Sequence, residues 1–271
     1  MDRLLNAIAL FLVILLFILE GTTTDHIRIL LAFVLSLLLS MTAFLWGWFS
    51  LDGFYAAVVT GTALLGLGGW ITALLVLLFF ISSNLITRSI PAGNPVTGNE
   101  IRRDGLQVWA NGFWMVLFAI LLFLFQSELF QLLIAVAIAS VTSDTWATEV
   151  GSRRGGKTLL ISRLIEVPPG TDGGVSFHGT LFALLGALLI AAAYLAFSFQ
   201  ASLFNFFLVL FCGFSGCIAD SYLGAVYQTG QRYRYSRIFR YARSRREQNH
   251  LVNWAATGIA CIIALLIIQL A

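Results

Sequence analysis

Two aspartates of this sequence lie inside long apolar segments, where a charged side chain is costly. Asp144 follows the apolar run 129–141, and Asp220 lies within the apolar run 206–227. An ionisable side chain inside a membrane-spanning helix costs roughly 3 kcal/mol of insertion free energy and usually serves a function. Because arginine-rich stretches follow both segments, we expect a metal and phosphate site at a membrane surface. The alternative is that both carboxyl groups only hydrogen-bond to neighbouring helices.

Each aspartate shares a predicted helix face with small residues, spaced three or four positions apart. The face around Asp144 consists of Ala137, Ser140, Thr148 and Gly151, and the face around Asp220 consists of Gly213, Gly216 and Gly224. Small side chains let helix backbones approach closely, so these faces would pack together and bring both aspartates into one cavity. Glu149 points away from that face but could complete a metal site from the helix end. The predicted catalytic and metal-binding residues are Asp144, Glu149 and Asp220.

A glycine-rich stretch, residues 167–179, is a candidate phosphate-binding loop. Its glycines allow backbone amides to turn toward a ligand, and Thr171 or Asp172 is the predicted N-cap of the next helix. Exposed amides at a helix N-terminus bind anions, and nearby basic side chains would clamp phosphate oxygens. A plain tight turn is the alternative, because no Walker sequence is present. The predicted phosphate-binding residues here are Arg153, Arg154, Lys157, Gly170, Thr171, Asp172, Gly173, Gly174 and Ser176.

Two pairs of side-chain amides repeat the same helical spacing. Gln107 and Asn111 are four residues apart, as are Asn249 and Asn253, so each pair shares one helix face. Buried amides need hydrogen-bond partners, which would be a ribose, a base, a phosphate or other helices. Arg103 precedes the first pair and is predicted to neutralise phosphate charge.

The composition sets these residues in a membrane. Of the 271 residues, 59% are hydrophobic and 11% are charged, whereas soluble domains carry about 25% charged residues. We therefore predict an all-α, polytopic transmembrane helix bundle. At about 20 apolar residues per crossing, the sequence contains about nine helices. They cover roughly residues 3–19, 27–49, 51–67, 70–88, 106–125, 129–151, 174–198, 203–227 and 250–270. The third is glycine-rich and could be broken or re-entrant.

The distribution of Lys and Arg predicts the orientation. Most of these residues fall in three connections, 88–103, 153–163 and 232–246, and nine helices would place all three on one side. Basic loops face the cytoplasm, so the N-terminus is predicted to be cytoplasmic. The third connection interleaves Arg with aromatic residues, and we expect it to bind anionic lipid headgroups of the bilayer and no nucleic acid.

Four motifs together resemble an integral-membrane family. They are residues 107–112 (QVWANG), 143–151 (SDTWATEVG), 168–176 (PPGTDGGVS) and 219–225 (ADSYLGA). They resemble the family that contains plant and cyanobacterial phytyl-phosphate kinase, from about residue 51 to the C-terminus. We therefore expect residues 1–50 to be variable transmembrane helices and 51–271 to form a membrane-embedded catalytic bundle. Asp144, Ala147 and Gly151 are also distantly similar to a motif of CTP-dependent polyprenol kinases and cytidylyltransferases.

The resemblance implies a phosphotransferase. It would convert an isoprenyl monophosphate of phytyl or geranylgeranyl type to the diphosphate at the cytoplasmic membrane face, with CTP or another nucleoside triphosphate as donor and Mg²⁺ as cofactor. In a prokaryote this would be the plasma membrane. Two alternatives stay open, a membrane cytidylyltransferase that makes a CDP-lipid and an ion-coupled transporter.

Overall fold

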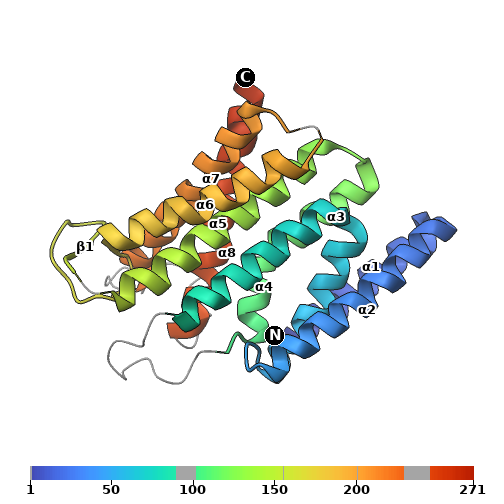
Figure 1. The fold of residues 1–271 in the computed structure, drawn as a ribbon, viewed down its shortest axis with the longest axis horizontal. Helices are drawn as coiled ribbons and strands as arrows, with labels where there is room; N and C mark the ends of the chain where they lie inside the picture. Colours follow the sequence, from blue (N-terminus) through green and yellow to red (C-terminus); the bar gives the residue numbers. More distant parts are fainter. Residues whose placement is uncertain (1, 90–101, 155, 200, 229–244) are drawn as a thin grey trace. The chain divides into compact units, whose positions relative to one another are not determined.

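The computed structural model describes residues 2–89, 102–154, 156–199, 201–228 and 245–271, and nearly all of them are helical (Figure 1). The predicted all-α transmembrane class is confirmed. The long helices are α1 (Asp2–Glu20), α2 (Thr23–Leu45), α3 (Leu51–Ser89), α4 (Gly105–Phe125), α5 (Glu128–Arg153), α6 (Phe177–Phe197), α7 (Leu203–Leu223) and α8 (Arg245–Leu270). Two short strands, β1 (Thr158–Leu160) and β2 (Gly174–Ser176), and a π-helical turn, η2 (Gly224–Gln228), complete the elements.

Eight helices of the described residues are long and apolar enough to span a membrane, against about nine predicted. The difference lies in α3, which joins the predicted third and fourth helices into one element of 39 residues. Within it, Gly69 has non-helical torsions (φ 76°, ψ −175°) that only glycine adopts readily. A straight helix of 39 residues would be about 58 Å long, roughly twice the hydrocarbon thickness of a bilayer.

A contact next to α3 places its start beside the start of α4. The amide of Ser50, just before α3, donates to the carbonyl of Arg103, just before α4 (3.1 Å). These two helix starts therefore lie on the same side, and the chain between them must cross an even number of times. We infer that the two arms of α3, before and after Gly69, each form one crossing. Trp109 Nε1 donates to Asn6 Oδ1 (2.6 Å), which places the start of α1 on that side as well. That this side is cytoplasmic stays a prediction.

The helices belong to two compact units, residues 1–74 with 99–134 and residues 75–98 with 135–271. In the first unit, the predicted helix 27–49 begins earlier, because Thr22 caps α2. The Thr22 side chain accepts a hydrogen bond from the Asp25 amide (3.3 Å), and the Asp25 carboxylate accepts one from the Thr22 amide (2.9 Å). This reciprocal capping box fixes the helix start.

In the second unit, α5 is the central helix, and residues 135–139 are completely buried. Its small face packs against α7, which itself packs against α6 and α8. A methyl group added to Gly216 would overlap the side chain of Ser140, so no larger residue fits where the two helices meet. The predicted packing of the two small faces is confirmed.

The connection between α5 and α6 is a β-hairpin that the sequence did not reveal. Strands β1 and β2 pair antiparallel, which holds residues 174–176 in an extended conformation. Helix α6 therefore begins at Phe177 and not at residue 174. Its N-cap is Ser176, whose hydroxyl accepts the amide of Gly179 (3.2 Å), so the predicted caps Thr171 and Asp172 are wrong.

The predicted helix 203–227 ends as an α-helix at Leu223 and continues through η2. The predicted last helix, 250–270, begins earlier, at Arg245. Most of the arginine-rich connection, residues 229–244, lies outside the described residues. Its predicted contact with lipid headgroups stays a prediction.

We predict that Gly216→Ala lowers the free energy of unfolding by about 1–3 kcal/mol, because the added methyl group overpacks the contact between α5 and α7. The matched control is Gly112→Ala in α4, where the new Cβ would lie 3.8 Å from the Thr60 side chain, an ordinary contact. This control should be neutral or slightly stabilising. Thermal unfolding of the detergent-solubilised variants measures both effects, and equal melting temperatures would contradict the packing.

Candidate functional site

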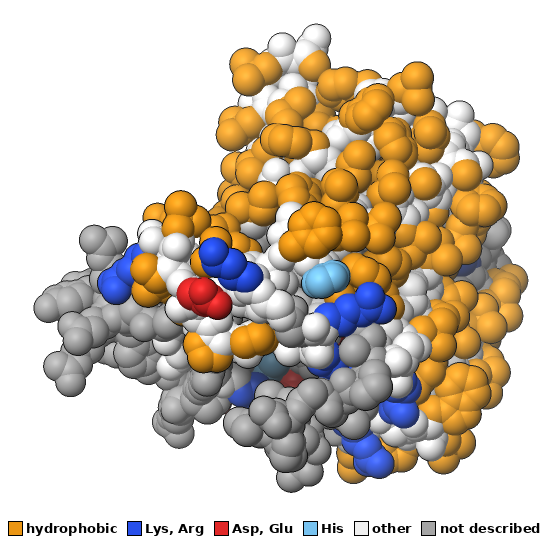
Figure 2. Space-filling model, turned by 60° about the vertical axis from the view of Figure 1, so that its left-hand side comes forward, with side chains coloured by type: hydrophobic (Ala, Val, Ile, Leu, Met, Phe, Trp, Pro, Cys, Tyr) orange, Lys and Arg blue, Asp and Glu red, His pale blue; other side chains and the backbone are white. Residues whose placement is uncertain are grey.

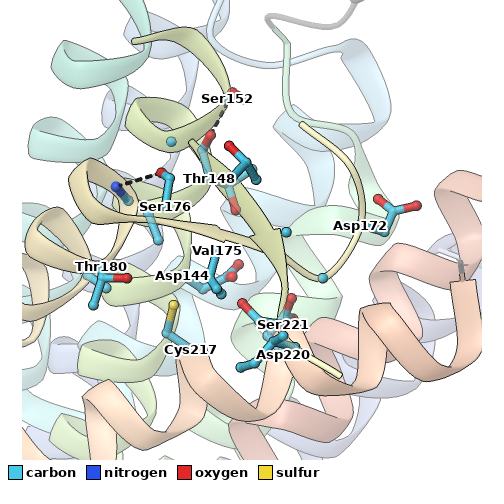
Figure 3. Close-up of a pocket in the computed structure, with 18 of the residues that line it drawn as sticks. Asp144, Thr148, Ser152, Asp172, Val175, Ser176, Thr180, Cys217, Asp220 and Ser221 are labelled. Atoms are coloured by element: carbon cyan, nitrogen blue, oxygen red, sulfur yellow. Dashed lines mark hydrogen bonds between the residues drawn. The ribbon is translucent and has the colours of Figure 1, made fainter. Parts of the chain in front are cut away.

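A cavity of about 260 Å³ lies in the second unit, where the ends of α5, α6 and α7 meet the β-hairpin (Figure 3). Asp144 reaches it from α5 and Asp220 from α7, as the packing of the two small faces predicted. The hairpin loop covers one side, and α8 adds Asn249. The predicted site residues that line this cavity are Asp144, Gly170, Thr171, Asp172, Gly173, Gly174, Ser176, Asp220 and Asn249.

The carboxyl groups of Asp144 and Asp220 are half-buried and close enough for a side-chain hydrogen bond. Helix α8 orients the second of them. The side-chain amide of Asn253 is oriented so that both its oxygen and its nitrogen have hydrogen-bond partners. Its nitrogen then donates to Asp220 Oδ2 (2.9 Å) and to the main-chain carbonyl of Asn249 (2.9 Å). The predicted pair Asn249 and Asn253 therefore belongs to the site, one residue in the cavity wall and the other holding a carboxylate.

A third carboxylate, Asp172, lines the cavity from the hairpin and interacts electrostatically with Asp220. Figure 3 shows Asp172 apart from the other two aspartates. Among the described residues, no three His, Cys, Asp or Glu side chains are grouped closely enough to hold a metal ion. The convergent oxygen ligands that the side chains offer are therefore those of Asp144 and Asp220.

The hairpin loop is a tight turn in which the amides of Thr171 and Gly174 donate to the main-chain carbonyls of Pro168 (3.2 Å) and Thr171 (2.8 Å). That amides of this loop bind phosphate stays a prediction. Gly170 (φ 80°) and Gly173 (φ 77°) both lie in the left-handed region. The Thr171 hydroxyl donates to the carbonyl of Pro168 (2.7 Å), which closes a tight turn. Gly173 lies against Ala225 of η2, and no side chain fits between them. These contacts fix the loop beside the C-terminal end of α7.

Several lining residues were not among the predicted site residues. They are polar or small side chains that lie near predicted ones in the sequence, and include Ser152, Thr180, Cys217, Ser221 and Gln228. Ser221 directly follows Asp220, and Thr180 is four residues after Ser176. Extending the predicted positions by one helical turn, from Ser176 and from Asp220, would have found Thr180 and Cys217.

Four predicted residues near the end of α5 lie outside the cavity lining. The carboxylate of Glu149 pairs with Arg153 (2.7 Å), whose guanidinium also donates to the main-chain carbonyl of Thr87. Arg154 is exposed and lies over the ring of Phe182, and Lys157 is exposed as well. Figure 2 shows Lys and Arg side chains gathered next to a hydrophobic surface. The roles of these four residues in binding metal or phosphate stay predictions.

The remaining predicted residues, Arg103, Gln107 and Asn111, belong to the first unit. The main-chain amide of Gln107 donates to Asp104, the N-cap of α4 (2.7 Å). Gln107 is half-buried and Asn111 is buried. Their predicted contact with substrate stays a prediction.

The helices and the cavity between them define an integral membrane protein with an acidic site at one end of its helices. The chain matches the integral membrane protein family DUF92 over residues 34–266 and belongs to this family. The predicted family and the membrane location are thereby confirmed.

Three relatives illustrate the family. An uncharacterized membrane protein of Methanocaldococcus jannaschii is 34% identical over 65% of this chain and 74% of its own length. Protein PGR of Arabidopsis thaliana is 28% identical over 76% of this chain and 81% of its own length. The chloroplastic protein VTE6 of Arabidopsis thaliana is 36% identical over 24% of this chain and 20% of its own length. No solved structure matches the chain.

We predict that Gly173→Ala detaches the hairpin loop from η2, because its Cβ would overlap Ala225. Gly170→Ala is the matched control, since its Cβ would lie 3.5 Å from the Ser152 side chain, an ordinary contact. Both changes carry the roughly 1–2 kcal/mol cost of a left-handed alanine, and only the first adds the overlap. Trypsin cleavage after the exposed Lys157 and Arg163 should therefore be faster in Gly173→Ala. Equal cleavage rates would contradict this contact.

Proposed function

We propose that this protein is a phosphotransferase that converts an isoprenyl monophosphate to the diphosphate with a nucleoside triphosphate as donor. The observation that supports it best is the convergence of Asp144 and Asp220, from two different helices, in a cavity at the end of the helices. The family resemblance supports phytyl or geranylgeranyl monophosphate as acceptor and CTP as donor. The 66-residue similarity to VTE6, a phytyl-phosphate kinase, supports the same class of acceptor.

The side chains of the cavity fit Mg²⁺. Mg²⁺ is usually held by one or two carboxylates, with waters and substrate phosphates completing its coordination. Asp144 and Asp220 are such a pair, and two ionised carboxylates this close repel each other unless a cation lies between them. When bound there, Mg²⁺ would neutralise phosphate charge.

The residues of the protein itself would position the reacting phosphate groups. Phosphoryl transfer needs alignment and charge stabilisation more than covalent chemistry, and a phosphate acceptor is already anionic, so a strong base is unnecessary. The N-terminus of α6 lines the cavity at Ser176 and Gly179, and a helix N-terminus favours an anion. The hydroxyl of Thr148, on α5, adds a hydrogen-bonding group to the cavity lining.

The direct test is an assay of the detergent-purified protein with geranylgeranyl or phytyl monophosphate, Mg²⁺ and each nucleoside triphosphate, followed by mass spectrometry of the lipids. The expected products are the lipid diphosphate and a nucleoside diphosphate, with CTP as the best donor. A CDP-lipid with pyrophosphate would instead show a cytidylyltransferase. No product from folded protein would favour the transporter class.

We predict that Asp144→Asn and Asp220→Asn each lower kcat by at least about a hundredfold, the loss typical when one charge-stabilising group is removed from an active site. The folded state should persist, because asparagine has nearly the same shape. Glu166→Gln is the control, because Glu166 is an exposed carboxylate of the connection between α5 and α6 and lies outside the cavity lining. Full activity in either variant would contradict the assignment of that aspartate to the active site.

Removal of divalent cations should abolish nucleotide binding itself as well as turnover. Three carboxylates line the cavity, and no Lys or Arg of the described residues does. An uncompensated triphosphate would therefore meet like charges in a partly buried site. Titration of a fluorescent CTP analogue with Mg²⁺ and with EDTA measures this, and equal affinity under the two conditions would contradict it.

A further inference from the structure

The cavity continues beyond the aspartates into the contact between α6 and α7, here called the α6–α7 seam. From α6 it is lined by Gly179, Thr180 and Ala183, and from α7 by Phe214, Cys217 and Ile218. The polar lining residues gather toward the hairpin, whereas Ala183, Phe214, Cys217 and Ile218 form an apolar end. Figure 3 shows Thr180 and Cys217 on the side of Asp144 that faces away from Asp172.

Two residues of the α6–α7 seam belong to the cavity and to the outer surface at once. Ile218 lines the cavity and is 45% exposed, and Thr180 lines it and is exposed as well. The outward-facing side chains next to them are hydrophobic, with Leu184 42% and Phe211 58% exposed. In an integral membrane protein such a surface faces lipid hydrocarbon. The cavity wall at the seam is therefore also part of the lipid-facing surface.

The depth of the seam also fits a lipid chain. Phe214 precedes Asp220 by six residues on α7, which corresponds to about 9 Å along the helix. The apolar end of the cavity thus lies about two helical turns deeper in the membrane than the carboxylates. A molecule with its phosphate at Asp220 and a hydrocarbon chain would match this change from polar to apolar lining.

We propose that the α6–α7 seam is a lateral port for the acceptor of the proposed reaction. The phosphate of the acceptor lies at Asp144 and Asp220, and its hydrocarbon chain leaves between Thr180 and Ile218 into the bilayer. This inference rests on the proposed function and narrows its substrate class to monophosphates with a membrane-anchored chain. The acceptor then never leaves the bilayer, and short, water-soluble isoprenyl monophosphates are poor substrates.

A binding experiment that needs no turnover tests the port. The protein in lipid nanodiscs is incubated with Mg²⁺ and a farnesyl monophosphate that carries a photoreactive diazirine in its first isoprene unit. After illumination, mass spectrometry should locate the label on the α6 and α7 peptides that contain Thr180 and Ile218. Excess unlabelled geranylgeranyl monophosphate should prevent this labelling.

Two variants fill the port with larger aromatic side chains. Thr180→Phe and Ile218→Trp should reduce the labelling and raise the KM for geranylgeranyl monophosphate by about tenfold or more, the scale of steric discrimination in an apolar pocket. The KM for the nucleotide should stay unchanged. The controls are Leu184→Phe and Phe211→Trp, which enlarge exposed residues of the same two helices outside the cavity lining. They should behave as the unmodified protein.

The outcomes separate the port from the proposed function. Labelling of the seam without any diphosphate product would support the port and contradict the proposed kinase activity. Diphosphate formation with an unchanged KM for geranylgeranyl monophosphate in both filling variants would support the kinase activity and contradict the port. Labelling at other helices, equally strong in Thr180→Phe, would overturn the port as well.

Discussion

The close approach of α5 to α6 and α7 is the constraint on which the rest of the second unit depends. Gly213 and Gly216 of α7 leave no room for a larger side chain against Ala139 and Ser140 of α5. On the other flank, Gly179 meets the backbone of α5 near Gly151, and the Ser143 hydroxyl donates to the carbonyl of Ala183 on α6 (2.8 Å). Lipid supplies no hydrophobic drive between helices, so close packing and such hydrogen bonds hold them together. This packing brings two carboxylates from different helices into one cavity.

Acidic side chains at this depth are stable because the protein supplies polar partners for them. Asp220 accepts a hydrogen bond from Asn253 of α8 and lies beside Asp144. The site also lies at the hairpin end of the helices, not at their midpoints. The polar end of the cavity is therefore beside the hairpin, while its apolar end lies at the α6–α7 seam. One cavity with two such ends suits a reaction between a soluble nucleotide and a lipid phosphate.

The basic residues at the end of α5 lie outside the cavity lining. Arg154 and Lys157 are exposed near the hairpin, and Arg153 is engaged with Glu149 and Thr87. Exposed positive charge near an acidic cavity raises the local concentration of anionic substrates without touching them. The first unit carries its own polar contacts, such as Asp104 at the start of α4, which serve its helix ends.

The sequence by itself determined the membrane class, nearly all helices and the two carboxylates with their small helix faces, because apolar length and helical spacing are local properties. It also indicated Asn249 and Asn253 by their spacing. Only the tertiary structure decided that residues 158 and 176 pair as strands, that Ser176 caps α6, and that the two arms of α3 form one element. It alone distinguished Ile218, which lines the cavity, from Phe211, which does not. These features depend on contacts between distant segments, and an apolar helix face looks the same in sequence whether lipid, protein or a cavity covers it.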